Sequence, residues 1–386
     1  MLQRLSTVRP EASARLRIRS IDALRGLVML LMLVDHTRES FYSQVPVPDP
    51  LGPDTPTALF VTRLTAHFCA PVFVFLTGLA AWLYAQSRGG PAAASDFLWK
   101  RGLFLIVLEL TVVNFAWGFD PTPPMHYLQV IWVIGLSMLA LAALVHLPRP
   151  VLIALGLAIV LGHNLLDGVH ATSGPGRVLW AVLHERMVFD LPWGGHVRVS
   201  YPLLPWIGVI TLGYALGPWF APEAEGATRR RGLVTLGLAA LALFVLLRAT
   251  NMYGDLHPWQ AGRDALGTAL QFVNLTKYPP SADFVLATLG VGLIVLAAFE
   301  RLPERAAGLL AVLGGAPLFF YLLHLYLLNG LNQLARALLG AEGPVSVPNV
   351  AALWLLAATV ALPCWFATRA FGRAKRRSGA WWMRYL

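Results

Sequence analysis

The stretch from Ser20 to Ser40, SIDALRGLVMLLMLVDHTRES, decides the fold class, because it combines a membrane-helix core with ionisable residues at both ends. Asp22 and Arg25 lie near its start, and the run DHTRE closes it. About 20 mostly apolar residues suffice to cross a bilayer as a helix. Ionisable groups at membrane depth usually face a protein interior or a water-filled cavity. The stretch therefore predicts a membrane helix with a functional side.

The composition extends this interpretation to the whole chain. Of 386 residues, 57% are hydrophobic and only 13% are charged, which is more apolar than a soluble protein of this length requires. We therefore predict an all-α, polytopic integral membrane protein with about ten transmembrane helices. The predicted spans are residues 20–42, 57–86, 97–117, 126–146, 150–166, 201–220, 231–249, 282–300, 308–335 and 349–371.

These spans divide the chain into three parts. Residues 1–19 form a basic N-terminus, residues 20–371 a single transmembrane domain, and residues 372–386 a C-terminal tail. Two long loops, 165–200 and 250–281, mix aromatic, proline and charged residues, a composition suited to ordered lids. We expect both to cover the non-cytoplasmic face.

The net charge of +10 does not indicate a nucleic-acid partner, because the basic residues sit between hydrophobic runs and set membrane topology instead. With both termini cytoplasmic, most of the 30 basic residues fall on the inner side. Only three of them are lysines, which suggests a GC-rich bacterial genome. We therefore predict a multi-pass protein of a bacterial inner membrane.

Arg25 and His36 are 11 residues apart, which is about three helical turns, so they share one face about 16 Å apart along the axis. Asp22 and Glu39 extend this stripe at its two ends. The alternative is structural: Asp22 stabilises the helix start, Arg25 pairs with it or snorkels, and His36 and Arg38 mark the membrane interface.

A second group lies in RLTAHFCAPVFVFLTG, where Arg63 and His67 are four residues apart on one face. Pro71 is expected to kink the helix beside them. Such a kink opens space for a ligand, but it is also common in purely structural membrane helices.

The third span carries Glu109 and Asn114, and a carboxylate there is costly unless it is paired or protonated. Arg25 is a candidate partner, and a structural ion pair and a substrate-facing group remain equally open for Glu109. His126 lies at the outer start of the fourth span. His324, inside the ninth, is either a ligand-facing group or a satisfied core histidine.

Most of the ten histidines, His163 and His184 among them, fall at or beyond the outer ends of spans, whereas His146 falls on an inner loop. This asymmetry suggests protonatable groups on the non-cytoplasmic face, although longer outer loops also explain it. The sequence contains no HExxH motif, zinc-ligand spacing, phosphate loop or dinucleotide fingerprint. We therefore expect no metal.

The opening helix, RIRSIDALRGLVMLLMLVDHTRE, resembles that of the transmembrane acyltransferase superfamily. The spacing of Arg25 and His36 is similar to that of the acyltransferase-3 proteins. The segments APVFVFLTGLAAW, YPLLPWIGVITLGYALG and GGAPLFFYLLHLYLL, with the terminal WWMRYL, resemble the bacterial relatives of heparan-α-glucosaminide N-acetyltransferase more closely.

This resemblance implies about ten helices around a central cavity. It also implies that acetyl-CoA enters from the cytoplasm and that its acetyl group passes to a hydroxyl or amine of a sugar or glycan on the opposite face. Arg25, with Asp22, then binds the CoA end of the donor, and His36 acts as the base, assisted by Asp35. We expect the remaining polar side chains of the spans to contact the acceptor, namely Arg38, Glu39, Arg63, Glu109, Asn114, His126 and His324.

One departure from the family affects the choice of base. The proposed catalytic histidine of the lysosomal enzyme lies in the loop after the first span, and the corresponding loop here, SQVPVPDPLGPDTP, contains none. His36 is therefore the leading base and His67 the second. The alternative class is a transporter of a small polar solute, but transporters typically show two corresponding halves, and no internal repeat is evident.

Overall fold

The computed structural model describes residues 11–45, 47–52, 55–378, 380 and 383. The helices are α1 (Glu11–Phe41), α2 (Thr57–Ala66), α3 (Cys69–Arg88), α4 (Pro91–Leu108), α5 (Asn114–Gly118), α6 (Val130–Leu144), α7 (Arg149–Gly162), α8 (Gly174–Leu183), α9 (Leu204–Leu216), α10 (Gly226–Thr250), α11 (Ala265–Phe272), α12 (Ala282–Phe299), α13 (Glu304–Gly314), α14 (Pro317–Leu339) and α15 (Val350–Arg377). Three short segments extend them, the π-helical η1 (Glu109–Val113) and the 3-10 helices η2 (His163–Leu166) and η3 (Gly217–Phe220).

The predicted terminal segments lie only partly within the described residues. α1 begins at Glu11, inside the predicted N-terminal segment, and α15 continues to Arg377, beyond the predicted end of the last span. Residues 1–10 and most of the closing AWWMRYL lie outside the described residues.

The chain is a helical membrane protein, but length and composition do not support ten spans. Six described helices are long and apolar enough to cross a membrane. The helices α13 and α14, which meet at a 70° bend, make a seventh span if they are counted together. The α6 and α9 segments are apolar but short, and α1 is long enough but carries charged residues at both ends. The predicted count of ten rested on hydrophobic runs alone, which do not separate crossing helices from short buried ones.

The all-α prediction is wrong in one detail, because three short strands form a small sheet. They are β1 (Met125–Leu128), β2 (Met187–Asp190) and β3 (His196–Val199), in the order β1-β3-β2. β3 pairs parallel to β1 and antiparallel to β2. The predicted fourth span therefore begins only at Val130, because the residues before it are in β1.

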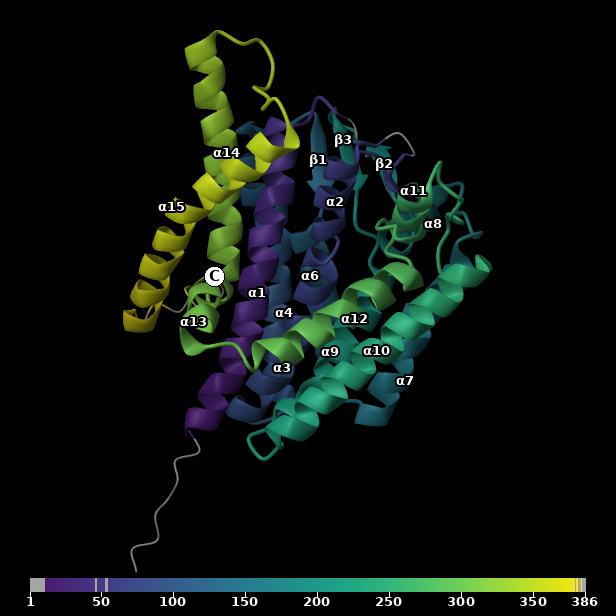
Figure 1. Cartoon of the computed structure of the whole chain (residues 1–386), viewed down its shortest axis with the longest axis vertical. Helices are drawn as coiled ribbons and strands as arrows, with labels where there is room; N and C mark the ends of the chain where they lie inside the picture. The colour runs from purple at the N-terminus through teal and green to yellow at the C-terminus, as the bar shows by residue number, and fades with distance from the viewer. Residues whose placement is uncertain (1–10, 46, 53–54, 379, 381–382, 384–386) are drawn as a thin grey trace, which may run out of the picture.

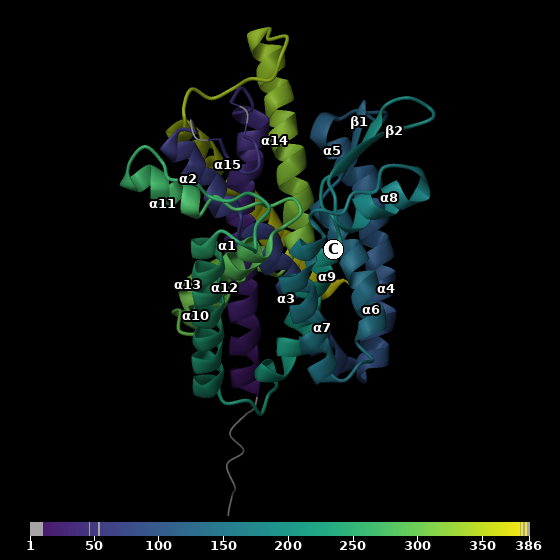
Figure 2. The ribbon, with the colours of Figure 1, turned by 90° about the vertical axis from the view of Figure 1, so that its right-hand side faces the viewer.

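The small sheet marks one end of the bundle, opposite the start of α1 (Figure 1). We call it the sheet end and the other the N-terminal end. Both predicted lid loops contain ordered elements at the sheet end: α8, β2 and β3 in the first, and α11 in the second. Figure 2 separates them, with α11 on one side of the molecule and the sheet with α8 on the other.

Glycines allow the helices to approach closely. A Cβ at Gly102 in α4 would lie 2.7 Å from the carbonyl oxygen of Gly135 in α6, and the reverse distance is the same. Gly237 in α10 makes an equivalent approach to Gly290 in α12. Small residues at such crossings are typical of membrane helices, where backbone contact replaces hydrophobic association. The first pair joins two helices that line the cavity described below, and the second joins two helices outside its lining.

Candidate active site

A cavity of about 360 Å³ runs along one side of α1, between α3, α4, α6 and α14. Asp22, Arg25, Met29, Met32 and His36 all line it, so the uninterrupted helix α1 presents the polar stripe to the cavity along its length. Asp22 and Arg25 lie toward the N-terminal end and His36 toward the sheet end. The polar groups at both ends of the opening stretch therefore meet in one interior space.

His36 is joined to His324 of α14 inside the bundle. His36 Nδ1 lies 2.7 Å from His324 Nε2, and His324 Nδ1 lies 2.8 Å from the carbonyl oxygen of Phe320. A carbonyl only accepts, so His324 carries its proton on Nδ1, and its neutral ring accepts at Nε2 from His36 Nδ1–H. A neutral His36 then keeps a lone pair on Nε2. The pair fixes the tautomer in which His36 can take up a proton.

Two further aromatic side chains surround the His36 ring. Trp117 and Tyr321 meet it edge to face, with ring centroids 5.3 and 5.9 Å away. Neither the indole Nε1 of Trp117 nor the buried hydroxyl of Tyr321 has a hydrogen-bond partner among the described residues. Tyr321 also lines the cavity. A donor beside the histidine is thus left for a group inside the cavity.

Asp35 is held by arginines and not by its neighbour His36. Arg63 Nη1 lies 2.9 Å from Asp35 Oδ2, and Arg38 Nε donates to Oδ1 at 3.0 Å. Arg38 also donates to Glu39, whose side chain is 40% exposed. Asp35, Arg38 and Arg63 are all buried, so the cluster is a fixed charge array at the sheet end of the cavity.

A lysine that the sequence did not single out faces the same region. Lys277 is buried, lines the cavity and interacts electrostatically with Asp35 and His36. Its ammonium lies 5.2 Å from the centre of the Tyr278 ring, and the Tyr278 hydroxyl donates to that of Tyr201 at 3.2 Å. The second long loop, together with Tyr201 directly after the first, thus supplies polar side chains to the sheet end of the cavity.

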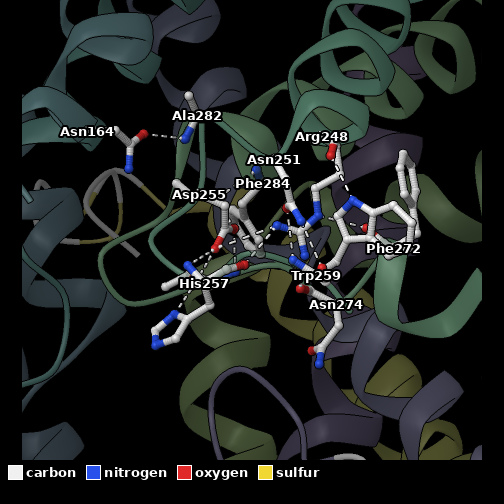
Figure 3. A network of polar contacts seen from close by, with 12 residues as sticks. Asn164, Arg248, Asn251, Asp255, His257, Trp259, Phe272, Asn274, Ala282 and Phe284 are labelled. Atoms are coloured by element: carbon white, nitrogen blue, oxygen red, sulfur yellow. Dashed lines mark hydrogen bonds and ion pairs between the residues drawn. The ribbon is translucent and has the colours of Figure 1, made fainter. Parts of the chain in front are cut away.

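The position of Lys277 is fixed by a polar network around Arg248 and Asp255 (Figure 3). Arg248 donates to four main-chain oxygens of the loop and lies 3.9 Å from Asp255. Asp255 accepts from the Thr276 N–H at 2.9 Å and from the Ser281 hydroxyl at 2.7 Å. These bonds hold the chain on both sides of Lys277, which explains why a loop residue can form part of a buried site.

At the N-terminal end of the cavity, Arg25 donates to Asp22 at 2.8 Å and to the carbonyl of Leu76 at 3.3 Å. Of the two candidate partners of Arg25, Asp22, one helical turn away, therefore pairs with it, and Glu109 does not. Arg101 and Lys375 line the same end. The sequence did not predict either of them at the site. Arg101 falls within the predicted span 97–117 and Lys375 within the predicted C-terminal tail, and nothing local shows that α4 and α15 turn them inward.

Aromatic rings accompany these cations. Tyr84 and Phe97 both line the cavity and stack with ring centroids 4.5 Å apart. The Arg101 guanidinium lies 5.8 Å from the centre of the Phe97 ring. This end therefore combines positive charge with flat aromatic surface.

Glu109 and Asn114 bond to the backbone around η1. Glu109 is fully buried, and its Oε1 accepts from the N–H of Gln129 at the start of α6. The helix dipole favours a negative charge at that position. Asn114 donates to the carbonyl oxygens of Glu109 and Tyr127 and accepts from the Tyr127 N–H. Both side chains join η1 to β1 and α6.

His126 and His67 lie away from the cavity lining. His126 is in β1 and its Nδ1 is buried. His67 lies in the break between α2 and α3, four residues before Pro71, and its ring packs 5.2 Å from that of Phe284. The second span is interrupted between α2 and α3, where Ala66 and Cys69 face the cavity and His67 does not.

The fold and the cavity define a polytopic helical membrane protein with a buried site suited to proton transfer. The chain belongs to the heparan-alpha-glucosaminide N-acetyltransferase family, whose catalytic-domain model matches residues 17–249. This membership indicates a transmembrane acetyltransferase. A comparison with curated proteins found no match.

The matched region covers α1 to α10 and includes His36, Asp35 and Arg63. His324 and Lys277 lie beyond it. The resemblance of α1 to the acyltransferase-3 proteins stays a prediction.

Proposed function

We propose that the protein moves an acetyl group from acetyl-CoA to a hydroxyl or amine of a sugar or glycan acceptor. The observation that carries this proposal is the single cavity along α1, with cations at one end and the His36–His324 pair near the other. The donor enters from the cytosolic side and the acceptor from the opposite side, with both termini cytoplasmic in a bacterial inner membrane.

The N-terminal end of the cavity suits the nucleotide part of CoA. Arg25, Arg101 and Lys375 supply positive charge for its phosphates, and the stacked rings of Tyr84 and Phe97 offer a surface for adenine. Asp22 orients Arg25 through their 2.8 Å contact. The pantetheine arm then follows Met29 and Met32 toward His36, because apolar side chains line that part of the cavity.

The chemistry at His36 follows from its tautomer. The acceptor N–H or O–H loses its proton to His36 Nε2 as its nitrogen or oxygen forms a bond to the acetyl carbonyl carbon. The carbon–sulfur bond breaks, and the CoA thiolate takes the proton from Nε2. His324 acts as a positioning residue, because its bond to Phe320 keeps the His36 Nδ1 proton in place.

The carbonyl oxygen becomes negatively charged as the bond forms, and a fixed donor beside it lowers the barrier. The hydroxyl of Tyr321 lines the cavity next to His36, has no hydrogen-bond partner among the described residues and is suited to that task. Lys277 adds positive charge on the same side. Arg63 and Arg38 hold Asp35, which keeps this end of the cavity ordered.

The acceptor is proposed to enter at the sheet end, where the two long loops serve as lids. Lys277 of the second loop and Tyr201, which directly follows the first, line the cavity. The Glu39 side chain, bonded to Arg38 near this end, is 40% exposed. Aromatic faces beside charged and hydroxyl groups are suited to a polar ring such as a sugar.

The decisive experiment reconstitutes the purified protein in liposomes with radiolabelled acetyl-CoA and a panel of amino sugars and glycans. Wild type is expected to transfer label, and His36→Ala is expected to lose about 10²–10⁴-fold of the rate. His146→Ala is the matched control, because this exposed histidine lies on a loop away from the cavity. Wild-type activity in His36→Ala would overturn the role of His36.

A transporter is the second candidate, and the 70° break between α13 and α14 is the observation that favours it, since transporters often use discontinuous helices. The same liposomes distinguish the two. Solute uptake without consumption of acetyl-CoA would establish transport, whereas CoA release that depends on an acceptor supports the acetyltransferase.

A further inference from the structure

Three potential metal ligands meet at the sheet end of α7, outside the lining of the cavity. His163 is in η2, Asp167 directly follows it, and His184 follows α8. One ligand atom from each of the three lies within 4.8 Å of the others. The two histidines are 21 residues apart, so no short motif in the sequence reveals the group.

Burial without hydrogen bonds is the second observation. His163 and His184 are only 2% and 4% exposed. Both ring nitrogens of His163 and Nδ1 of His184 lack a hydrogen-bond partner among the described residues, and His184 Nε2 lies 3.3 Å from Asp167 Oδ1. Burying polar nitrogens without partners costs free energy. A bound cation would satisfy them.

The carboxylate is already oriented by a second layer of contacts. Asn164 donates through its amide nitrogen to Asp167 Oδ2 at 2.8 Å, which leaves Oδ1 toward His184. The oxygen of Asn164 accepts from the N–H of Ala282 at 2.9 Å, which ties the group to the start of α12 (Figure 3). The Trp180 ring meets that of His184 edge to face at 5.3 Å. Such outer contacts are typical of metal sites.

We propose that His163, Asp167 and His184 bind one divalent transition-metal ion, with zinc as the probe. Two imidazoles and one carboxylate are a donor set that zinc accepts, leaving a fourth position for water or a further ligand. Bonds of about 2.0–2.2 Å bring tetrahedral ligands to roughly 3.3 Å from one another. The three ligand atoms now lie within 4.8 Å of one another, and small side-chain rotations would bring them to that shorter distance. The ion links α7 to the segment after α8, just before β2.

The test compares two double variants in chains without a polyhistidine tag. The variant His163→Ala/His184→Ala removes two donors, and His170→Ala/His196→Ala removes two exposed histidines of the same loop. After removal of metals, each protein is dialysed against zinc chloride and its bound zinc is measured by mass spectrometry. Wild type and control are expected to hold one zinc per chain, and the donor variant to bind at least ~100-fold more weakly.

The proposal is overturned if wild type holds no more zinc than the donor variant. If the donor variant fails to fold, a measurement on the wild type decides. Cobalt(II) is added to the metal-free wild type, and visible absorption bands that disappear on addition of zinc are expected. No such bands would also overturn the site. Neither readout depends on acetyl transfer.

Discussion

Two buried histidine pairs, His36–His324 and His163–His184, differ in how their ring nitrogens are satisfied. The first forms a hydrogen-bonded chain that ends at the carbonyl of Phe320. The second has neighbouring rings with centroids 5.6 Å apart, and their nitrogens have no hydrogen-bond partner in the part of the chain that the structure describes. A chain that ends at a carbonyl fixes a tautomer and suits proton transfer, whereas unpaired nitrogens suit a cation. Burial alone does not distinguish the two uses.

The two pairs also differ in their surroundings. His36 lines the cavity, together with the cations of the N-terminal end. His163 and His184 lie outside it, close to a carboxylate. Three substitutions and the removal of metal test this difference between the two pairs.

The largest effect is expected from His324→Ala. His36 loses the partner that fixes its tautomer, and loss of the equivalent orienting group in other enzymes costs on the order of 10²–10⁴-fold in kcat. The KM for acetyl-CoA is expected to stay within about twofold, because His324 lies away from the cations of the donor end. Steady-state kinetics measure both. His324→Asn keeps an acceptor and is expected to regain part of kcat; equal losses in both variants would argue against positioning.

Tyr321→Phe removes the unpaired hydroxyl beside His36 while leaving the ring. A donor to the developing oxyanion is worth about 10²–10³-fold in kcat, and the loss is expected in the chemical step. Single-turnover acetyl transfer measures it. Tyr326→Phe is the control, since its hydroxyl donates to the carbonyl of Val112 outside the cavity lining. Similar rates for Tyr321→Phe and wild type would remove Tyr321 from the mechanism.

Asn164→Ala tests the other pair. Asp167 loses the contact that orients it, and such outer-layer changes weaken metal affinity by about 10–100-fold. Zinc titration by calorimetry measures the change. Asn251→Ala is the matched control, because this asparagine bonds to the backbone of Trp259 within the same polar network. An unchanged zinc affinity would show that Asn164 does not support the site.

The smallest effect is expected from removing the metal itself. None of its three ligands lines the cavity, so chelation is expected to change the rate of acetyl transfer by less than about twofold. The same chelation is expected to lower the midpoint of thermal unfolding, because an ion that binds the folded state stabilises it. A large loss of activity with an unchanged melting temperature would place the metal in the reaction instead.

The membrane helices were predictable because long apolar runs have few other structures available. The interior face of α1 was predictable as well, since helical periodicity places Arg25 and His36 on one side. The short strands were not predictable, because β1 and β3 are far apart in the sequence and pair only after the chain between them has folded back. The predicted number of membrane crossings, ten, is higher than the six or seven that the length and composition of the described helices support.

The site was predictable only in part. His36 and His324 were both singled out, but their 2.7 Å contact joins residues 288 positions apart. Glu109 and Asn114 were interpreted as acceptor-binding, and the structure bonds them to the backbone of α6 and β1. Lys277 was missed because it lies in a loop, where no periodicity indicates direction.

The sequence by itself determined that the chain is a helical membrane protein and that α1 carries a polar stripe, because both follow from local hydrophobicity and a fixed helical repeat. Tertiary structure alone decided which buried histidines are hydrogen-bonded and which are left without partners. Those contacts depend on helices and loops that are distant in sequence. His36 is satisfied because α14 brings His324 against it. His163 instead meets the ring of His184, which follows α8, and its nitrogens find no hydrogen-bond partner among the described residues.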